Sequence, residues 1–110
     1  MRVDVRQDAD TVTITLIGEL DEGNIGQAEE QALAAGRRPE VRTLVLDLSE
    51  LGFMDSTGIA MLMRLEREAR RHGHRLLLME PTEVVRGRLD RTGLLSMLSL
   101  AERSPKGSVS

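Results

Sequence analysis

The sequence has no cysteine, tryptophan or tyrosine, and its single aromatic residue is Phe53. Without cysteine the chain can form no disulfide framework and offers no thiol nucleophile, so a cytoplasmic protein is the default expectation. One aromatic side chain cannot form the stacking platform on which proteins bind single-stranded bases. The formal net charge of −3 disfavours contact with phosphate backbones. We therefore expect no nucleic-acid partner.

Long apolar runs are also missing. A membrane-spanning helix needs roughly 18–20 consecutive apolar residues, and no run in this sequence approaches that length. The first ten residues, MRVDVRQDAD, alternate like a strand and hold no continuous apolar segment, so we expect neither a signal peptide nor a membrane partner. With 110 residues, 40% hydrophobic and 30% charged, the chain has the composition of one globular domain.

The apolar pattern predicts the order strand, strand, helix, strand, helix, strand, helix, strand. Val3 and Val5 alternate with polar residues, as do Val12, Ile14 and Leu16 after a short Asp-rich turn, which predicts an antiparallel hairpin that ends at Gly18. The hairpin is followed by a helix over 24–35, a buried strand over 41–48 and a loop from residue 51. A second helix reaches residue 72, and a further buried strand covers 74–80. The third helix starts at 81–82, and a turn at 93 precedes a short final strand or helical piece.

Because strands alternate with helices after the hairpin, the remaining strand pairings should be mostly parallel. The expected fold class is therefore α/β, with a single mixed β-sheet, an N-terminal antiparallel hairpin and helices packed on the sheet. Residues 1–100 are expected to form this domain. The polar residues 101–110 are expected to form a mobile C-terminal tail.

The helix after Ser56 has one clear apolar stripe. At 3.6 residues per turn its core-facing positions are Gly58, Met61, Leu62, Leu65 and Ala69. Gly58 would let the helix start approach the sheet closely, because glycine has no Cβ. Three further apolar residues turn away from this stripe within two turns of Ser56: Ile59, Ala60 and Met63. They are either scattered surface residues or a contact patch for a protein partner, rimmed by Arg64 and Arg67.

Asp55, Ser56 and Thr57 stand where this helix begins, and Asp55 or Ser56 is the expected N-cap. Capping alone would explain the cluster. A nucleophilic serine would need a nearby base, but His72 and His74 lie at the other end of the helix, roughly 24 Å away at 1.5 Å per residue. The G-x-S-x-G elbow and a GK[ST] phosphate loop are both missing. We therefore expect no enzyme and no catalytic residue.

Acidic residues offer one further possibility. Asp47 lies near the end of an apolar strand, but the first strand supplies no pair of acids for the magnesium that a phosphate-accepting aspartate needs. Asp21 and Asp55 could lie close enough to hold a cation weakly. We nevertheless predict no metal site and no cofactor.

Three segments in register resemble the STAS domain, and most closely the bacterial anti-sigma factor antagonists. The resemblance runs from Arg2 to Leu100. Its segments are LIGELD at Leu16–Asp21, LVLDLSELGFMDSTGIAML at Leu44–Leu62 and RGRLDRTGLLSML at Arg86–Leu98.

The resemblance implies a protein–protein switch. In the family, the unphosphorylated antagonist binds an anti-sigma factor with a histidine-kinase-like ATP-binding fold and thereby frees a sigma factor. The anti-sigma factor acts as a serine kinase on the antagonist, and a PP2C-type phosphatase reverses the modification. Matched to this sequence, the phosphoacceptor is Ser56, with Thr57 as a second hydroxyl. The resemblance also places Asp55 before the phosphoacceptor and Asp21 in the GELD turn. Together with the apolar patch described above, the predicted partner-binding residues are Asp21, Asp55, Ser56, Thr57, Ile59, Ala60, Met63 and Arg64.

One segment departs from the family pattern. After GELD the family runs into a Thr/Ala-rich helix start, whereas EGNIGQ at residues 22–27 is polar and contains glycine. The loop belongs to the partner-facing end, so its change bears on which partner is bound. Two other functions stay open at this stage: an interaction subunit of a stress-signalling or lipid-transport assembly, and a nucleotide-binding STAS module.

Overall fold

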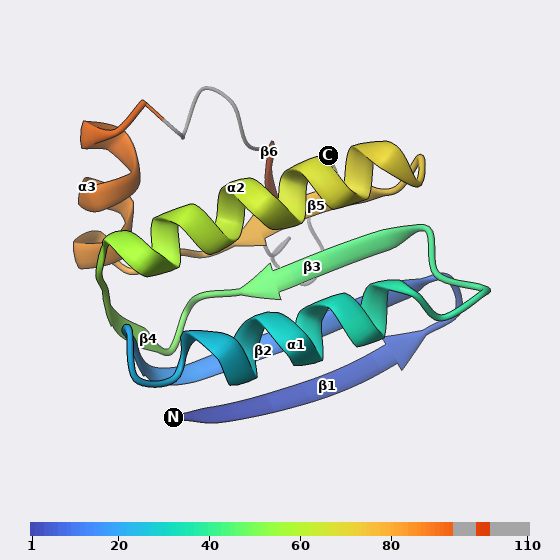
Figure 1. Ribbon diagram of the computed structural model, residues 1–110, viewed down its shortest axis with the longest axis horizontal. Helices are drawn as coiled ribbons and strands as arrows, with labels where there is room; N and C mark the ends of the chain where they lie inside the picture. Colours follow the sequence, from blue (N-terminus) through green and yellow to red (C-terminus); the bar gives the residue numbers. More distant parts are fainter. Residues whose placement is uncertain (94–98, 102–110) are drawn as a thin grey trace, which may run out of the picture.

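The computed structural model describes residues 1–93 and 99–101 of the chain (Figure 1). Nine elements are described, in this order: β1 (Arg2–Asp8), β2 (Thr11–Leu20), α1 (Ile25–Gly36), β3 (Thr43–Asp47), β4 (Leu51–Met54), α2 (Ser56–Arg71), β5 (Arg75–Met79), α3 (Glu83–Arg91) and β6 (Ser99–Ala101).

The strands form one mixed sheet in the order β1-β2-β3-β5-β6, and β4 pairs with β2 outside this path. Only the β1–β2 pair is antiparallel among the described strands, and every other pairing is parallel. Helices α1 and α2 lie side by side against the sheet, while α3 stands at one end (Figure 1). The α/β fold class and the N-terminal hairpin predicted from the sequence are confirmed.

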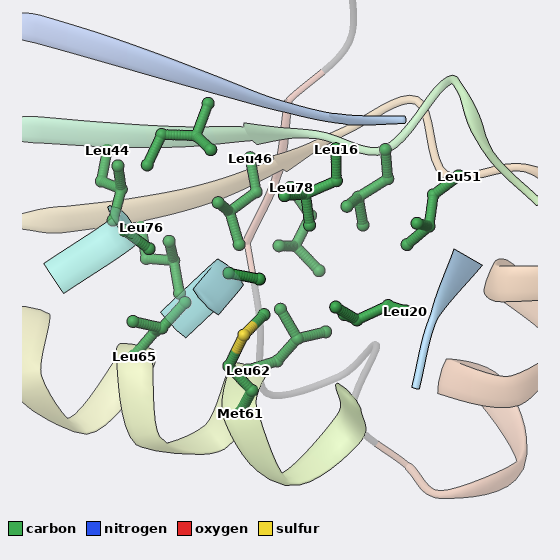
Figure 2. Close-up of a cluster of buried hydrophobic side chains, with 14 of the residues drawn as sticks. Leu16, Leu20, Leu44, Leu46, Leu51, Met61, Leu62, Leu65, Leu76 and Leu78 are labelled. Atoms are coloured by element: carbon green, nitrogen blue, oxygen red, sulfur yellow. The ribbon is translucent and has the colours of Figure 1, made fainter. Parts of the chain in front are cut away.

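The hydrophobic core fills the space between the sheet and the two long helices (Figure 2). Alternate residues of β2, β3 and β5 point into it, because successive side chains of a strand face opposite sides of a sheet. The predicted stripe of α2 faces the same core, and all five of its residues are buried. The core side chains labelled in Figure 2 are Leu16, Leu20, Leu44, Leu46, Leu51, Met61, Leu62, Leu65, Leu76 and Leu78.

The sequence interpretation was wrong around Gly18 and Leu51. Strand β2 does not end at Gly18 but continues to Leu20, and residues 51–54 form the strand β4 instead of a loop. Gly18 has a φ of +116°, a conformation that glycine adopts without a steric penalty. There the register shifts and β2 changes partner, from β3 before Gly18 to β4 after it. A turn residue inside a strand marks such an irregularity.

Helix α3 buries only part of its apolar surface. Val85 and Leu89 are buried, but Val84 is 54% exposed. The short helix presents only one i, i+4 pair to the core, and Val84 lies outside it. Thr82 caps the helix by accepting a hydrogen bond from Val85 N at 3.4 Å, and its hydroxyl donates to Leu51 O at 2.8 Å.

The C-terminal predictions fall partly outside the described residues. Gly93 ends a turn after α3 with a φ of +78°, as the sequence indicates. Strand β6 then pairs parallel to β5. The predicted tail over 101–110 begins one residue too early, because Ala101 lies in β6. Residues 94–98 and 102–110 lie outside the description, so a mobile tail over 102–110 remains a prediction.

Gly58 holds the start of α2 close to the sheet, as expected. A Cβ built at this position would lie 2.5 Å from Met54 Cγ and 3.1 Å from Leu20 Cδ2. These distances are shorter than normal carbon–carbon contacts, so any larger residue would push the helix away from β2 and β4.

We expect Gly58→Ala to lower the free energy of unfolding by about 1–3 kcal/mol, because the added methyl overpacks a filled site. Urea denaturation measures the loss. Gly87→Ala in α3 is the matched control, since a Cβ there would meet no atom of the described residues within 4 Å outside its own helix backbone, and it should stabilise the protein by up to ~1 kcal/mol through helix propensity. Equal effects of the two variants would contradict the close approach at Gly58.

Candidate functional site

The candidate site lies where β2 and β4 end side by side. Leu20 and Met54 are paired in parallel register, and the amide of Asp55 donates to Leu20 O at 3.1 Å. Asp21 and Asp55 each follow one of these paired residues. Two acids 34 positions apart in the sequence are therefore brought to the same edge of the sheet, because parallel strands end at the same edge.

Asp55 is the N-cap of α2. Its extended backbone, with φ −94° and ψ −173°, is the usual N-cap conformation. Its Oδ1 accepts hydrogen bonds from Thr57 N at 2.9 Å and Gly58 N at 3.3 Å, and the Thr57 hydroxyl donates to the same oxygen. Asp55 thus binds the amides of Thr57 and Gly58 in the first turn of α2 without any contribution from the Ser56 side chain.

The second carboxylate oxygen of Asp55 holds the neighbouring loop. Asp55 Oδ2 accepts a hydrogen bond from Glu22 N at 3.2 Å. Hydrogen bonds to the carboxylate hold the pKa of Asp55 below its usual value, although desolvation acts in the opposite direction. The bond from the Thr57 hydroxyl has the largest effect, and the amides of Gly58, Thr57 and Glu22 add to it. A single side chain therefore fixes the loop between β2 and α1 against the first turn of α2.

The loop itself is closed by its own side chains. Asn24 Oδ1 accepts from Asp21 N at 3.0 Å, and Asn24 Nδ2 donates to Glu19 O at 2.8 Å. Asp21 Oδ1 accepts from Gly23 N at 2.9 Å. The polar EGN segment at residues 22–24 therefore stabilises the loop, because local side-chain hydrogen bonds of this kind stabilise turns. Asn24 precedes α1 but makes no side-chain capping bond to it.

Ser56 and Thr57 differ sharply in their surroundings. Ser56 is the first residue of α2 and is exposed, whereas Thr57 is half-buried. Within residues 1–93 and 99–101 the Ser56 hydroxyl makes no hydrogen bond, while the Thr57 hydroxyl is bound to Asp55. Of these two hydroxyls, that of Ser56 is the one that is both accessible to another protein and free of a hydrogen bond within the described residues.

The chain matches the family model described as the STAS domain over residues 2–106. The chain belongs to the STAS domain family. An anti-sigma F factor antagonist of Lysinibacillus sphaericus is 33% identical over 85 residues, which cover 77% of this chain and 73% of that protein. This match identifies the branch of anti-sigma factor antagonists as the one that this STAS domain resembles.

Two solved structures have the same fold. The anti-sigma factor antagonist SpoIIAA in its unphosphorylated form is 25% identical and superposes with a TM-score of 0.80, covering 96% of this chain and 91% of that chain. The Bacillus cell fate determinant SpoIIAA in the phosphorylated form is 24% identical with a TM-score of 0.74, covering 96% of this chain and 95% of that chain.

The apolar residues expected beside Ser56 do not all face solvent in this STAS domain. Met63 is 41% exposed and Ala60 is half-buried, but Ile59 is only 8% exposed and belongs to the core. The prediction that Ile59 turns away from the core was wrong. Ile59 lies about 60° around the helix from Leu62, and the apolar stripe of a core-facing helix is at least about 100° wide, so the stripe includes this lateral position.

Arg64, expected at the rim of this patch, is held by a neighbouring helix. Its guanidinium forms two hydrogen bonds with Glu29 of α1, Nε to Oε2 at 2.8 Å and Nη2 to Oε1 at 2.7 Å. This contact lowers the pKa of Glu29 and raises that of Arg64. The pair positions Arg64 between α1 and α2, and any partner there meets a neutralised pair in place of a lone cation.

The sequence interpretation missed the exposure of Phe53. Phe53 in β4 is 40% exposed, and the guanidinium carbon of Arg88 in α3 lies 5.8 Å from the centre of its ring, within cation–π distance. Together with Val84 it puts apolar surface on the elements next to Asp55. The sequence offered no signal for this, because the short segment Leu51–Met54 does not show that its two middle residues are exposed and its two end residues buried.

Two other kinds of site were considered from the sequence and set aside, a serine activated by histidine and a cation site. His72 caps the far end of α2, and His74 follows it. Among the described residues no group of three or more His, Asp or Glu residues is placed to hold a metal ion. No helix in the described part of the chain is long and apolar enough to cross a membrane.

Proposed function

We propose that this STAS domain is an anti-sigma factor antagonist whose binding is switched off by phosphorylation of Ser56. In the unphosphorylated form it binds an anti-sigma factor with a histidine-kinase-like ATP-binding fold and frees a sigma factor. The anti-sigma factor is also the serine kinase, and a PP2C-type phosphatase removes the phosphate. A cytoplasmic location and a role without catalysis are part of this proposal.

The observation that carries the proposal is the free, exposed hydroxyl of Ser56 at the start of α2. Asp55 is the cap that binds the amides of Thr57 and Gly58, so a kinase can take the Ser56 oxygen without removing a cap. The relatives support the role, because the similar proteins are anti-sigma factor antagonists. The proposed contact surface comprises Asp21, Asp55, Ser56, Thr57, Ala60, Met63 and Arg64.

A phosphate at Ser56 is compatible with the fold for an electrostatic reason. Phosphorylation adds about −1.5 to −2 charges, and the positive end of the helix dipole stabilises such a charge by roughly 0.3–1 kcal/mol. Asp55 is the nearest acid in the sequence and would oppose part of this gain. The related SpoIIAA in phosphorylated form still has a fold that superposes on this chain with a TM-score of 0.74.

We expect incubation with the cognate kinase, ATP and magnesium to place one phosphate on Ser56, located by mass spectrometry. The matched variants are Ser56→Ala, which should take up none, and Thr57→Ala, which should still be phosphorylated because the Thr57 hydroxyl is occupied by Asp55. A phosphate on Thr57, or none with any kinase that binds the protein, would refute the switch.

A further inference from the structure

Strand β1 forms an open edge of the sheet. Among the described strands it pairs only with β2, and the strand order begins with it. Figure 1 shows β1 as the outermost element on its side, with α1 between it and α2. An unpaired edge presents backbone N–H and C=O groups to any strand that can align with it. The question is whether the side chains on β1 favour a particular partner.

The charges along β1 alternate in sign on one face of the sheet. Arg2, Asp4, Arg6 and Asp8 share this face, since they pair with Ile17, Thr15, Thr13 and Thr11 of β2 and directly opposed residues project to the same side. All four are exposed. On the other face Val3 packs against the core, while Val5 in the middle of the strand is 37% exposed.

We propose that β1 pairs antiparallel with β1 of a second copy of this chain, about a two-fold axis through Val5. In this register each residue i faces residue 10 − i of the other copy. Arg2 then lies opposite Asp8 and Asp4 opposite Arg6, each contact occurring twice. Val5 meets Val5 on the other face and covers exposed apolar surface. The two sheets become one continuous sheet.

The charge pattern selects this register over its neighbours. A shift by two residues puts Asp4 opposite Asp4 or Arg6 opposite Arg6, and like charges directly opposed destabilise a strand pair. A shift by one residue would place the charged face of one copy beside the apolar face of the other. A charged edge that only prevents association needs no alternation of sign, so the alternation favours pairing with itself.

The chain can form these contacts without disrupting its own fold. The only ion pair within the described part of β1 is Arg2 to Asp4, 3.2 Å long with side chains 73% and 49% exposed. Such an exposed pair contributes little and can be exchanged for contacts between copies. Figure 1 shows α1 between β1 and α2, and this inference does not depend on the proposed function.

The decisive experiment uses charge reversal with mixing, followed by sedimentation equilibrium. The wild-type chain should shift from 12.2 kDa toward twice that mass as its concentration rises to about 1 mM in low salt, since a short edge gives a small interface. Asp4→Arg and Arg6→Asp should each weaken the dimer at least about ten-fold, because each creates two like-charge contacts. Molar salt should also weaken it.

Mixing provides a result that no other interface produces. In an equimolar mixture, Asp4→Arg and Arg6→Asp chains should form a mixed dimer, because each new charge then faces its opposite. The double variant Asp4→Arg/Arg6→Asp should dimerise alone, like the wild type. Arg67→Asp makes the same charge change as Arg6→Asp at an exposed position of α2. It is the matched control and should change nothing, and circular dichroism checks the fold of each variant.

Three results would overturn the proposal. The first is a wild-type chain that stays monomeric at 1 mM in low salt. The second is a dimer that both single variants leave intact, which would place the interface elsewhere. The third is a failure of the mixed single variants and of the double variant to recover the dimer, which would show that the charges do not set the register.

Discussion

Replacing Ser56 with glutamate is expected to weaken binding to the anti-sigma factor about 100-fold, and full phosphorylation of the wild type about 1,000-fold. Ser56→Ala should bind with wild-type affinity but should no longer be switched off. Isothermal titration calorimetry with the anti-sigma factor, ADP and magnesium measures each dissociation constant.

The size of this effect follows from where the charge lies. Ser56 is exposed on the first turn of α2, so an added charge faces the partner and not the core. A unit charge about 4 Å from a like charge costs about 4 kcal/mol at an effective dielectric of 20, and the charge must also be removed from water when the interface forms. The same charge is tolerated within the monomer by the helix dipole.

Ala34→Glu is the matched control for this experiment. It adds the same charge at an exposed position near the end of α1, away from α2's first turn (Figure 1), and it should leave the affinity unchanged. A folded Ser56→Glu protein that binds as tightly as the wild type would show that charge at this position does not control binding.

Asp55→Ala is expected to lower Tm by about 5–10 °C, because α2 loses its N-cap. The same change should free the Glu22 amide, whose hydrogen bond to Asp55 Oδ2 is 3.2 Å long. Hydrogen exchange at Glu22 should then accelerate together with exchange at Thr57 and Gly58 in α2's first turn. Differential scanning calorimetry and amide exchange measured by NMR give the two readouts.

Asp55→Asn separates the two roles of this side chain. The amide oxygen can still accept from Thr57 N and Gly58 N, whereas the NH2 group cannot accept from Glu22 N. Exchange should therefore accelerate mainly at Glu22, with a smaller drop in Tm than for Asp55→Ala. Unchanged exchange at Glu22 in both variants would show that Asp55 does not hold the loop.

The stability difference between wild type and Asp55→Asn should also depend on pH. The pKa of Asp55 in the folded protein is below its ordinary value of 3.8, so its ionised form stabilises the fold above that value. This contribution should be lost as pH falls through the folded-state pKa. The difference in Tm between the two proteins should therefore shrink as pH is lowered from about 5 to about 2. A constant difference over this range would contradict the hydrogen bonds assigned to the carboxylate.

Local patterns predicted much of the fold and the start of the site. The apolar stripe of α2 is confirmed because its five positions depend only on helical spacing. The sequence left the N-cap open between Asp55 and Ser56, and the structure shows that it is Asp55. The hairpin was recognisable from alternation, and its register agrees with it.

The errors arose where distant segments determine the environment. Gly18 was expected to end a strand, but β4 offers β2 a new partner beyond it. Ile59 was expected at the surface, but its lateral position reaches the core. The exposure of Phe53 and Val84 was not foreseen, although both residues are apolar. Periodicity alone cannot say how many neighbours surround a helix or a short strand.

The sequence by itself determined the order of the elements, the core face of α2 and the capped helix start that carries Ser56. These features depend on residues within a few positions of one another. Only the tertiary structure decided that Asp55 reaches Glu22, 33 residues away, that Arg64 is paired with Glu29, 35 residues away, and that β1 is an edge. Such contacts join segments through space, and no local periodicity encodes which segments become neighbours.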